Sequence, residues 1–132
     1  MADMFKLQVI TPDKKFYEGE VSMVELTTTE GQIGVYKNHI PMTAIVAPGV
    51  LTIHEENDVK RAALHAGFIQ ILPELITVMA ETVEWPDEID INRAEEARVR
   101  AERRIKETNG EVDVMRAELA YKRALVRLTV AK

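Results

Sequence analysis

The uneven distribution of proline and glycine divides this chain at Pro86. All five prolines and five of the six glycines lie at or before that residue, and the rest of the chain contains Gly110 alone. Because proline and glycine interrupt helices, the first part favours short strands and turns, and the second part favours helices. Gly110 follows Asn109 near the middle of the second part, so the sequence predicts two helices joined there by a tight turn.

Residues 1–86 contain many short segments in which apolar and polar side chains alternate, separated by turn signals. The clearest segments are residues 4–10, 21–28, 50–54 and 75–83. This pattern is typical of an antiparallel sandwich or barrel, and not of a parallel α/β fold. Gly19 and the pair of Ala66 and Gly67 are expected to interrupt strands. About 85 residues is enough chain for a core of its own.

The two predicted helices carry small residues on the faces that would meet. The positions expected to point inward are Ile91, Ala94, Ala97 or Arg98, Ala101, Ile105 and Thr108 on the first helix, and Val114, Ala117, Tyr121, Ala124, Leu128 and Ala131 on the second. Alanine lets two helices approach closely but buries little apolar area. The hairpin is therefore expected to be marginally stable alone, and it is a candidate moving part. Asp90 stands where its carboxylate can cap the first helix.

Four arginines of the predicted hairpin form a second pattern. Arg93 and Arg100 are seven residues apart and share one helix face, while Arg123 and Arg127 are four apart and share another. Folding at the turn brings them towards one end of the hairpin, where their guanidinium groups would favour an anion such as phosphate. The alternative is a solvated surface balanced by neighbouring glutamates. Spacing alone favours this alternative, because arginine-rich helix faces are common.

The charge is divided along the chain as well. The whole chain has a formal net charge of −5, and residues 1–86 carry 6 Lys and Arg against 12 Asp and Glu. Residues 112–132, in contrast, carry 5 Lys and Arg against 2 Asp and Glu. An acidic chain does not indicate a nucleic-acid partner, whereas a locally basic helix can meet an acidic protein surface.

Several classes of site and segment are not supported by the sequence. There is no apolar run of about 18 residues, and we expect neither a membrane span nor a signal peptide. The chain has no cysteine, which excludes disulfides and thiol chemistry. The three histidines, His39, His54 and His65, lack metal-ligand spacing, and no nucleophile elbow, P-loop or dinucleotide fingerprint is present. We therefore expect no catalytic residue and no metal site, and we interpret His39 as a loop histidine bonded to backbone.

Five short segments then occur in an order that is specific in combination, although each is weak alone. They are residues 8–13, 30–35, 38–41, 48–49 and 65–68. Together with the helical hairpin behind them, they resemble the epsilon subunit of the F-type rotary ATP synthase over essentially the whole chain. Two positions depart from many relatives: Gln32 stands in place of a glutamate, and Ala66 in place of a glycine.

The resemblance implies an α+β fold, with a β-sandwich of about ten antiparallel strands followed by an antiparallel α-helical hairpin. The boundaries would be residues 1–86 for the sandwich and 87–132 for the hairpin. It also implies a non-catalytic rotor subunit of a proton- or sodium-translocating synthase. In this family the sandwich binds the gamma subunit and the c ring, and the extended hairpin inhibits ATP hydrolysis.

In bacterial members that bind ATP, the nucleotide holds the hairpin folded on the sandwich. Their motif, Ile/Leu-Asp-x-x-Arg-Ala, is matched by residues 89–94. The resemblance therefore implies that ATP contacts Glu84, Ile89, Asp90, Arg93, Ala94, Arg100, Arg123 and Arg127. With this resemblance, an ATP site becomes the favoured interpretation of the arginines. Glu84 and Asp90 would either orient arginines or accept a hydrogen bond from the adenine amino group.

The resemblance further implies contacts with other subunits. Thr11 and His39 would meet the gamma subunit, and Gln32 would meet the c ring. In the extended state the catalytic beta subunit would be met by Arg116, Lys122, Arg123 and Arg127. The implied partners are the gamma, alpha and beta subunits and the c ring, at the cytoplasmic face of the bacterial membrane. Isolated, the protein is expected to be a monomer with no cofactor, and ATP would be a regulatory ligand.

A second functional hypothesis stays open. The chain could be a β-sandwich interaction module whose hairpin is a docking arm without any response to nucleotide. A docking arm does not need all four arginines together, so their arrangement separates the two hypotheses.

Overall fold

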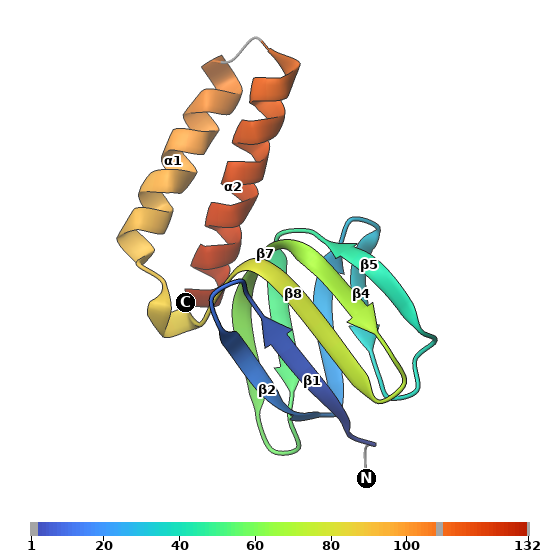
Figure 1. Ribbon diagram of the computed structural model, residues 1–132. Helices are drawn as coiled ribbons and strands as arrows, with labels where there is room; N and C mark the ends of the chain where they lie inside the picture. The colour runs from blue at the N-terminus through green and yellow to red at the C-terminus, as the bar shows by residue number, and fades with distance from the viewer. Residues whose placement is uncertain (1–2, 108–109, 132) are drawn as a thin grey trace.

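A β-sandwich carrying a pair of long helices at one end makes up the fold (Figure 1). The computed structural model describes residues 3–107 and 110–131. The described strands are β1 (Phe5–Ile10), β2 (Lys15–Val21), β3 (Met23–Thr28), β4 (Gly31–Val35), β5 (Met42–Val46), β6 (Gly49–His54), β7 (Val59–Ile71) and β8 (Leu75–Glu84). They are followed by the 3-10 helix η1 (Pro86–Glu88) and the helices α1 (Ile91–Glu107) and α2 (Glu111–Ala131). The predicted fold class, a sandwich followed by a helical hairpin, is confirmed.

Strand β7 connects the two layers of the sandwich. Its first half, Val59 to Leu64, pairs with β6, and its second half, Gly67 to Ile71, pairs with β5. Strand β8 follows β7 along most of this length. The other strands continue outwards as β1 and β2 beyond β8, and as β3 and β4 beyond β5 and β6. The long strands therefore hold both layers in one hydrogen-bonded network.

Two details of the strand prediction are wrong. The described residues form eight strands instead of about ten, and neither predicted break interrupts a strand, since β2 runs through Gly19 and β7 runs through Ala66 and Gly67. One pair is also parallel, since β1 lies beside β8 in the same direction. Ladder hydrogen bonds on both sides of a glycine can keep a strand continuous, and the glycine then marks a bend or a close approach.

The bend within β7 depends on Gly67. Ala66 has φ +36° and Gly67 has φ +149°, and the second value lies in a region that is almost restricted to glycine. A Cβ at Gly67 would lie 2.1 Å from the carbonyl oxygen of Met79 and 2.9 Å from Cα of Ala80. Strand β8 thus approaches the bend more closely than any side chain would permit.

The sandwich core is formed by the inward residues of the alternating strands. Leu7, Val24, Leu51 and Ile69 are among the side chains with no exposed surface. A separate, smaller apolar cluster joins the hairpin to the sandwich, formed by Ala63, Ile89 and Val130 with Val50, Val126 and Ala131 beside them. The hairpin therefore rests on a few small residues, whereas the sandwich has an extensive core of its own.

The predicted seam between the helices is confirmed at four of its alanines, while Ala97 and Ala131 are only partly buried. Ala94 and Ala101 of α1 and Ala117 and Ala124 of α2 are all buried. Ile91 is an exception, because it is 47% exposed at the first turn of α1.

Two predicted hairpin positions cannot be compared with the structure. The turn at Asn109 and the inward position of Thr108 lie outside the described residues.

Replacing Gly67 tests the close approach of β8. We expect Gly67→Ala to lower the free energy of unfolding by about 3 kcal/mol or more, because backbone strain and overpacking add. Urea unfolding followed by the fluorescence of Trp85 measures the change. Gly31→Ala is the matched control, since Gly31 also has a positive φ (+121°) but has no atom within 4 Å of an added Cβ. Equal losses at the two positions would contradict the role of β8.

Candidate functional site

The chain segment between the sandwich and α1 is held by two capping contacts. The backbone N–H of Trp85 donates to Oε1 of Glu88 at 2.8 Å, which closes the turn of η1. The N–H of Arg93 donates to Oδ1 of Asp90 at 3.1 Å, so the prediction that Asp90 caps the first helix is confirmed. The ring of Trp85 also stacks on Phe16, with 4.3 Å between centroids. These contacts fix where the hairpin leaves the sandwich.

A polar contact holds the end of α2 against the sandwich. Nε of Arg127 donates to Oε1 of Glu84 at 2.7 Å, and Nε2 of His65 lies 3.3 Å from the same oxygen. Glu84 is the last residue of β8, and His65 lies on the neighbouring strand β7. One carboxylate oxygen thus joins both long strands to the second helix.

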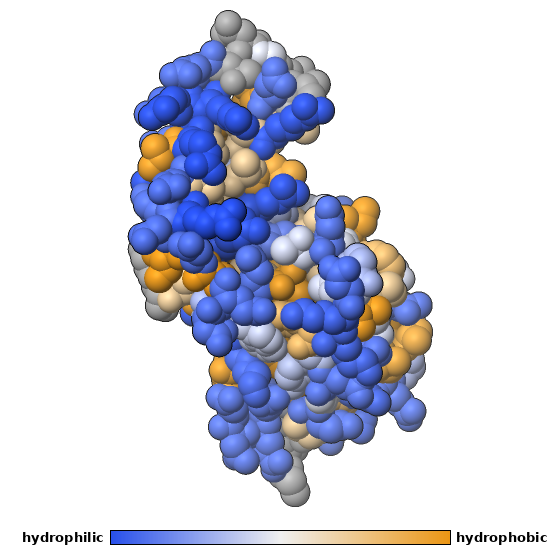
Figure 2. Space-filling model, turned by 60° about the vertical axis from the view of Figure 1, so that its left-hand side comes forward, coloured by the Kyte–Doolittle hydropathy of each residue, from blue (hydrophilic) through white to orange (hydrophobic). Residues whose placement is uncertain are grey.

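A hollow of about 510 Å³ lies where the sandwich, η1 and the hairpin meet. Its lining residues come from all three parts of the fold: Glu84, Glu88, Asp90, Arg93, Ala94, Glu96, Ala97, Arg100 and Arg127. Figure 2 shows strongly hydrophilic side chains gathered on the hairpin and around its junction with the sandwich. The volume is within the range of pockets that hold small organic ligands.

The structure brings six of the eight predicted nucleotide contacts to this hollow. They are Glu84, Asp90, Arg93, Ala94, Arg100 and Arg127. Ile89 is instead buried in the apolar cluster beneath the hairpin. Arg123 lines a separate hollow of about 100 Å³, which it shares with His65, Ala66, Glu81, Thr82 and Arg127.

Most carboxylates of the larger hollow have a hydrogen-bond or ion-pair partner, whereas two of its arginines have no ion pair in the described part of the chain. Glu84 is paired with Arg127, Glu88 accepts from the backbone of Trp85, and Asp90 caps α1. Within residues 3–107 and 110–131, neither Arg93 nor Arg100 has an ion pair. The guanidinium groups of these two arginines therefore remain available to an anion, whereas three of the carboxylates already have partners.

The smaller hollow contains a buried histidine. His65 is 2% exposed, and burial lowers its pKa, with the positive charge of Arg127 acting in the same direction and Glu84 opposing both. Nδ1 of His65 and Nε of Arg123 are buried without a hydrogen-bond partner among the described residues. These surroundings favour the neutral form of the ring, which shares the smaller hollow with Glu81 of β8 and the two arginines of α2.

Sequence reasoning missed seven residues that line the two hollows, which are Glu88, Glu96, Ala97, His65, Ala66, Glu81 and Thr82. Glu96 and Ala97 lie one turn after Arg93 and one turn before Arg100, so helical spacing could have included them. Glu88 follows Trp85 at the spacing of a capping contact. His65 had no sequence signal, because its proximity to Glu84 depends on how β7 and β8 are paired.

The residues predicted to contact other subunits lie at separate places on the surface. Thr11 is in the turn after β1, where its hydroxyl donates to the carbonyl oxygen of Lys14 at 3.2 Å. Gln32 is exposed on β4. His39 is half-buried in the next loop, and its Nδ1 lies 2.9 Å from the carbonyl oxygen of Ile40, so the interpretation of His39 as bonded to backbone is confirmed. Thr11 and His39 are not brought together.

The basic residues of α2 are divided between two environments. Arg116 and Lys122 are exposed, while Arg123 and Arg127 face the sandwich. Large apolar residues are exposed as well around β4 and β5, where Ile40 is 78% and Ile45 is 63% exposed. Sequence reasoning did not select this apolar surface.

The described part of the chain has neither a membrane-spanning helix nor a cluster of metal ligands. No helix there is long and apolar enough to cross a bilayer. No group of three or more His, Asp or Glu residues there could hold a metal ion.

Comparison with known proteins identifies relatives over the whole chain. The beta-sandwich domain of the ATP synthase delta/epsilon chain matches residues 4–86, and the long alpha-helix domain of the same chain matches residues 87–132. An ATP synthase epsilon chain from Caldanaerobacter subterraneus subsp. tengcongensis is 42% identical, covering 99% of this chain and 96% of the relative. One from Alkaliphilus oremlandii is 45% identical over 84% of this chain and 83% of the relative.

Solved structures share the fold at low sequence identity. A chain of the Euglena gracilis mitochondrial ATP synthase superposes with a TM-score of 0.83 at 20% identity, covering 97% of this chain and 81% of that one. A chain of the Tetrahymena thermophila mitochondrial ATP synthase superposes with a TM-score of 0.74 at 12% identity, covering 99% of this chain and 98% of that one. The sandwich with a helical hairpin is therefore an arrangement found in assembled synthases.

The contact between Arg127 and Glu84 can be tested by substitution. We expect Arg127→Ala to weaken the docking of α2 by about 1–2 kcal/mol, because a charge-assisted hydrogen bond is lost. Hydrogen exchange of the last turns of α2 should become faster in the variant. Arg116→Ala removes the same charge from an exposed position of the same helix and should leave the exchange unchanged. Similar exchange rates in the two variants would show that the ion pair does not hold the helix.

Proposed function

The chain belongs to the family of ATP synthase delta/epsilon chains, and from that premise we propose that it is a regulatory subunit of the rotor. In this proposal the protein is not itself an enzyme. Its sandwich connects the gamma subunit with the c ring in the central stalk, and its hairpin inhibits ATP hydrolysis when released. ATP bound in the larger hollow keeps the hairpin on the sandwich.

The proposal that the hollow binds ATP rests on one observation, which is that two arginines line it without an ion pair among the described residues. Arg93 and Arg100 share one face of α1, two turns apart, and Arg127 of α2 lines the same space. The planar guanidinium group binds phosphate oxygens in pairs, so three such groups suit a polyphosphate. The carboxylates of Glu84 and Asp90 lie at the same hollow, where an amino group of a base could be bound.

The position of the hollow explains how a ligand would act on the hairpin. Its walls come from β8, η1, α1 and α2, so the hollow exists only while the hairpin is docked. A ligand that binds only this state shifts the equilibrium towards it by its differential affinity. The apolar cluster beneath the hairpin is small, so it contributes little free energy to docking. The free energy of ligand binding is therefore enough to decide between the docked and the released state.

Release of the hairpin would make the basic face of α2 available. Arg123 and Arg127 face the sandwich in the docked state, whereas Arg116 and Lys122 are already exposed. On release all four would be free to meet acidic surface on the catalytic beta subunit. The same arginines thus serve two states, and they cannot serve both at once.

The sandwich offers surfaces for the rest of the rotor. The exposed apolar residues around β4 and β5, including Ile40 and Ile45, form the kind of patch that marks a protein interface. We assign this patch, together with Gln32, His39 and Thr11, to contacts with the gamma subunit and the c ring. Attachment through these partners would place the protein at the cytoplasmic face of the bacterial membrane.

Titration of the isolated protein with ATP tests the nucleotide part. We expect saturable binding by calorimetry, with ADP weaker than ATP because it offers one phosphate fewer to the arginines. Trp85 adjoins Glu84, so its fluorescence should change on binding. Arg93→Ala and Arg100→Ala should each raise the Kd about tenfold or more, which corresponds to about 1.4 kcal/mol.

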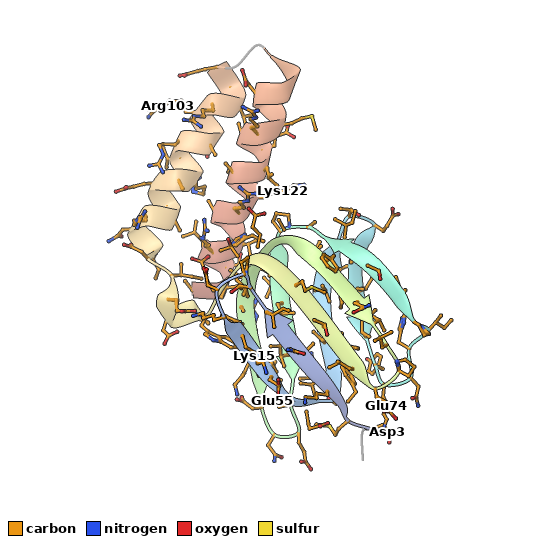
Figure 3. The ribbon with its side chains drawn as sticks, viewed as in Figure 1. Asp3, Lys15, Glu55, Glu74, Arg103 and Lys122 are labelled. Carbon is orange, nitrogen blue, oxygen red and sulfur yellow. The ribbon has the colours of Figure 1, made fainter. Side chains whose placement is uncertain are left out.

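The matched control for this titration is Arg103→Ala, which removes an exposed arginine of α1 outside the hollow (Figure 3). Its Kd should equal that of the unchanged protein. A Kd that is insensitive to both Arg93→Ala and Arg100→Ala would falsify the site. The absence of any binding would instead favour the docking arm without a nucleotide response.

Inhibition is tested by combining the protein with the catalytic head of its own synthase. The double variant Arg116→Ala with Lys122→Ala should inhibit ATP hydrolysis several-fold less, because two charges that meet the beta subunit are lost. The double variant Arg103→Ala with Arg104→Ala removes the same charge from α1 and should inhibit normally. If both double variants inhibit equally, α2 does not contact the head through these residues.

A further inference from the structure

His65 has an environment that the proposed nucleotide site does not explain. It lies on β7, outside the larger hollow, and is 2% exposed. Nε2 lies 3.3 Å from Oε1 of Glu84, and Nδ1 has no hydrogen-bond partner within the described ranges. This geometry suits a neutral ring in which Nε2–H donates to the carboxylate and Nδ1 carries no proton.

The charged groups around His65 come from two elements. Strand β8 contributes Glu84 and Glu81, and helix α2 contributes Arg123 and Arg127.

The other neighbours of β7, which are β5, β6 and η1, contribute no residue to the hollow of His65. The carboxylates of η1 lie elsewhere, since Asp87 lines a hollow with Val59 and Glu88 lines the larger hollow. Strand β5 has no titratable residue, and the only one of β6, His54, pairs with Val59 at the far end of β7. The docked helix is therefore the source of both positive charges near the ring.

We propose that His65 is a positioning residue of the junction. Its neutral ring holds the carboxylate of Glu84 against Arg127, and protonation of the ring releases α2 from the sandwich. The proposal rests on the proposed function only for the statement that a released hairpin inhibits, and the docking step itself is independent of nucleotide.

Protonation disfavours the docked state for three reasons. The added proton would make Nδ1–H a buried donor without an acceptor among the described residues. The charged ring would lie beside two guanidinium groups in a small hollow, where Glu84 is already shared with Arg127. Burial and these charges lower the pKa of His65 in the docked state. Departure of α2 removes both arginines and admits water, while Glu84 stays.

The direction of the pH dependence follows from this difference. In the released state the pKa of His65 should approach the ordinary value of about 6.5. Docking is therefore fully stable above that value and is lost as the pH falls towards the lower pKa of the docked state. One proton is involved, so the ratio of docked to released protein should fall by at most about tenfold per pH unit.

The chain has no cysteine, which permits site-specific labelling of the full-length protein. Glu74→Cys and Arg103→Cys place two fluorophores at the end of the sandwich remote from the hairpin and near the far end of α1 (Figure 3). Single-molecule energy transfer then counts docked and released molecules without nucleotide, from about pH 8 to about pH 5.5. We expect the docked fraction of this labelled protein to decrease as the pH is lowered.

His65→Gln keeps an amide donor near the position of Nε2 and cannot be protonated, so its docked fraction should not change with pH. His54→Gln removes a histidine of β6, which lies opposite Val59 at the far end of β7. This variant should keep the pH dependence of the docked fraction. A pH-independent docked fraction in the labelled parent would overturn the proposal, and so would an unchanged profile in His65→Gln.

A second readout needs no substitution at His65. Titration of its ring by NMR should give a higher apparent pKa in Arg127→Ala than in the unchanged chain, and an equal or lower value would overturn the proposal. ATP binding measured at about pH 8, where His65 is neutral, separates the two proposals. If ATP does not bind but docking still depends on His65, the nucleotide site is wrong and the role of His65 stands.

Discussion

The carboxylate of Glu84 is the point at which the two parts of the molecule are joined by charge. It ends strand β8, accepts a hydrogen bond from Arg127 of α2 and lies beside His65 of β7. The apolar contact between hairpin and sandwich is a small cluster that includes Ala63, Ile89 and Val130. Glu84 and Arg127 both line the larger hollow, and Arg127 also lines the smaller one. The shape of both hollows therefore depends on the ion pair between these two residues.

The weakness of the hairpin is a consequence of its composition. Alanines at the seam bring α1 and α2 close together, but they contribute little buried area to either the seam or the junction. An equilibrium between docked and released states needs only a few kcal/mol to be shifted across most of its range. A larger apolar interface would hold the hairpin more firmly in one position.

The features that could be predicted from the sequence were those encoded locally. The cap at Asp90 and the alanine seam follow from spacing along one helix, and the resemblance to relatives predicted the sandwich. The continuity of β7 through Gly67 and the parallel pairing of β1 with β8 depend on neighbours that are distant in sequence. The same limitation hid His65, whose proximity to Glu84 requires the register in which His65 pairs with Thr82.

Strand pairing also determines the order in which the molecule can be completed during synthesis. Ala63, His65 and Glu84 form the surface on which α2 rests, and Ala63 pairs directly with Glu84 across β7 and β8. All of these residues precede the helices in the chain, and domains generally fold from the N-terminus as they emerge from the ribosome. The helices, whose contacts are local, then form quickly and meet a surface that is already assembled. The hairpin is therefore the last part to be added, and its docking is not a condition for folding of the rest.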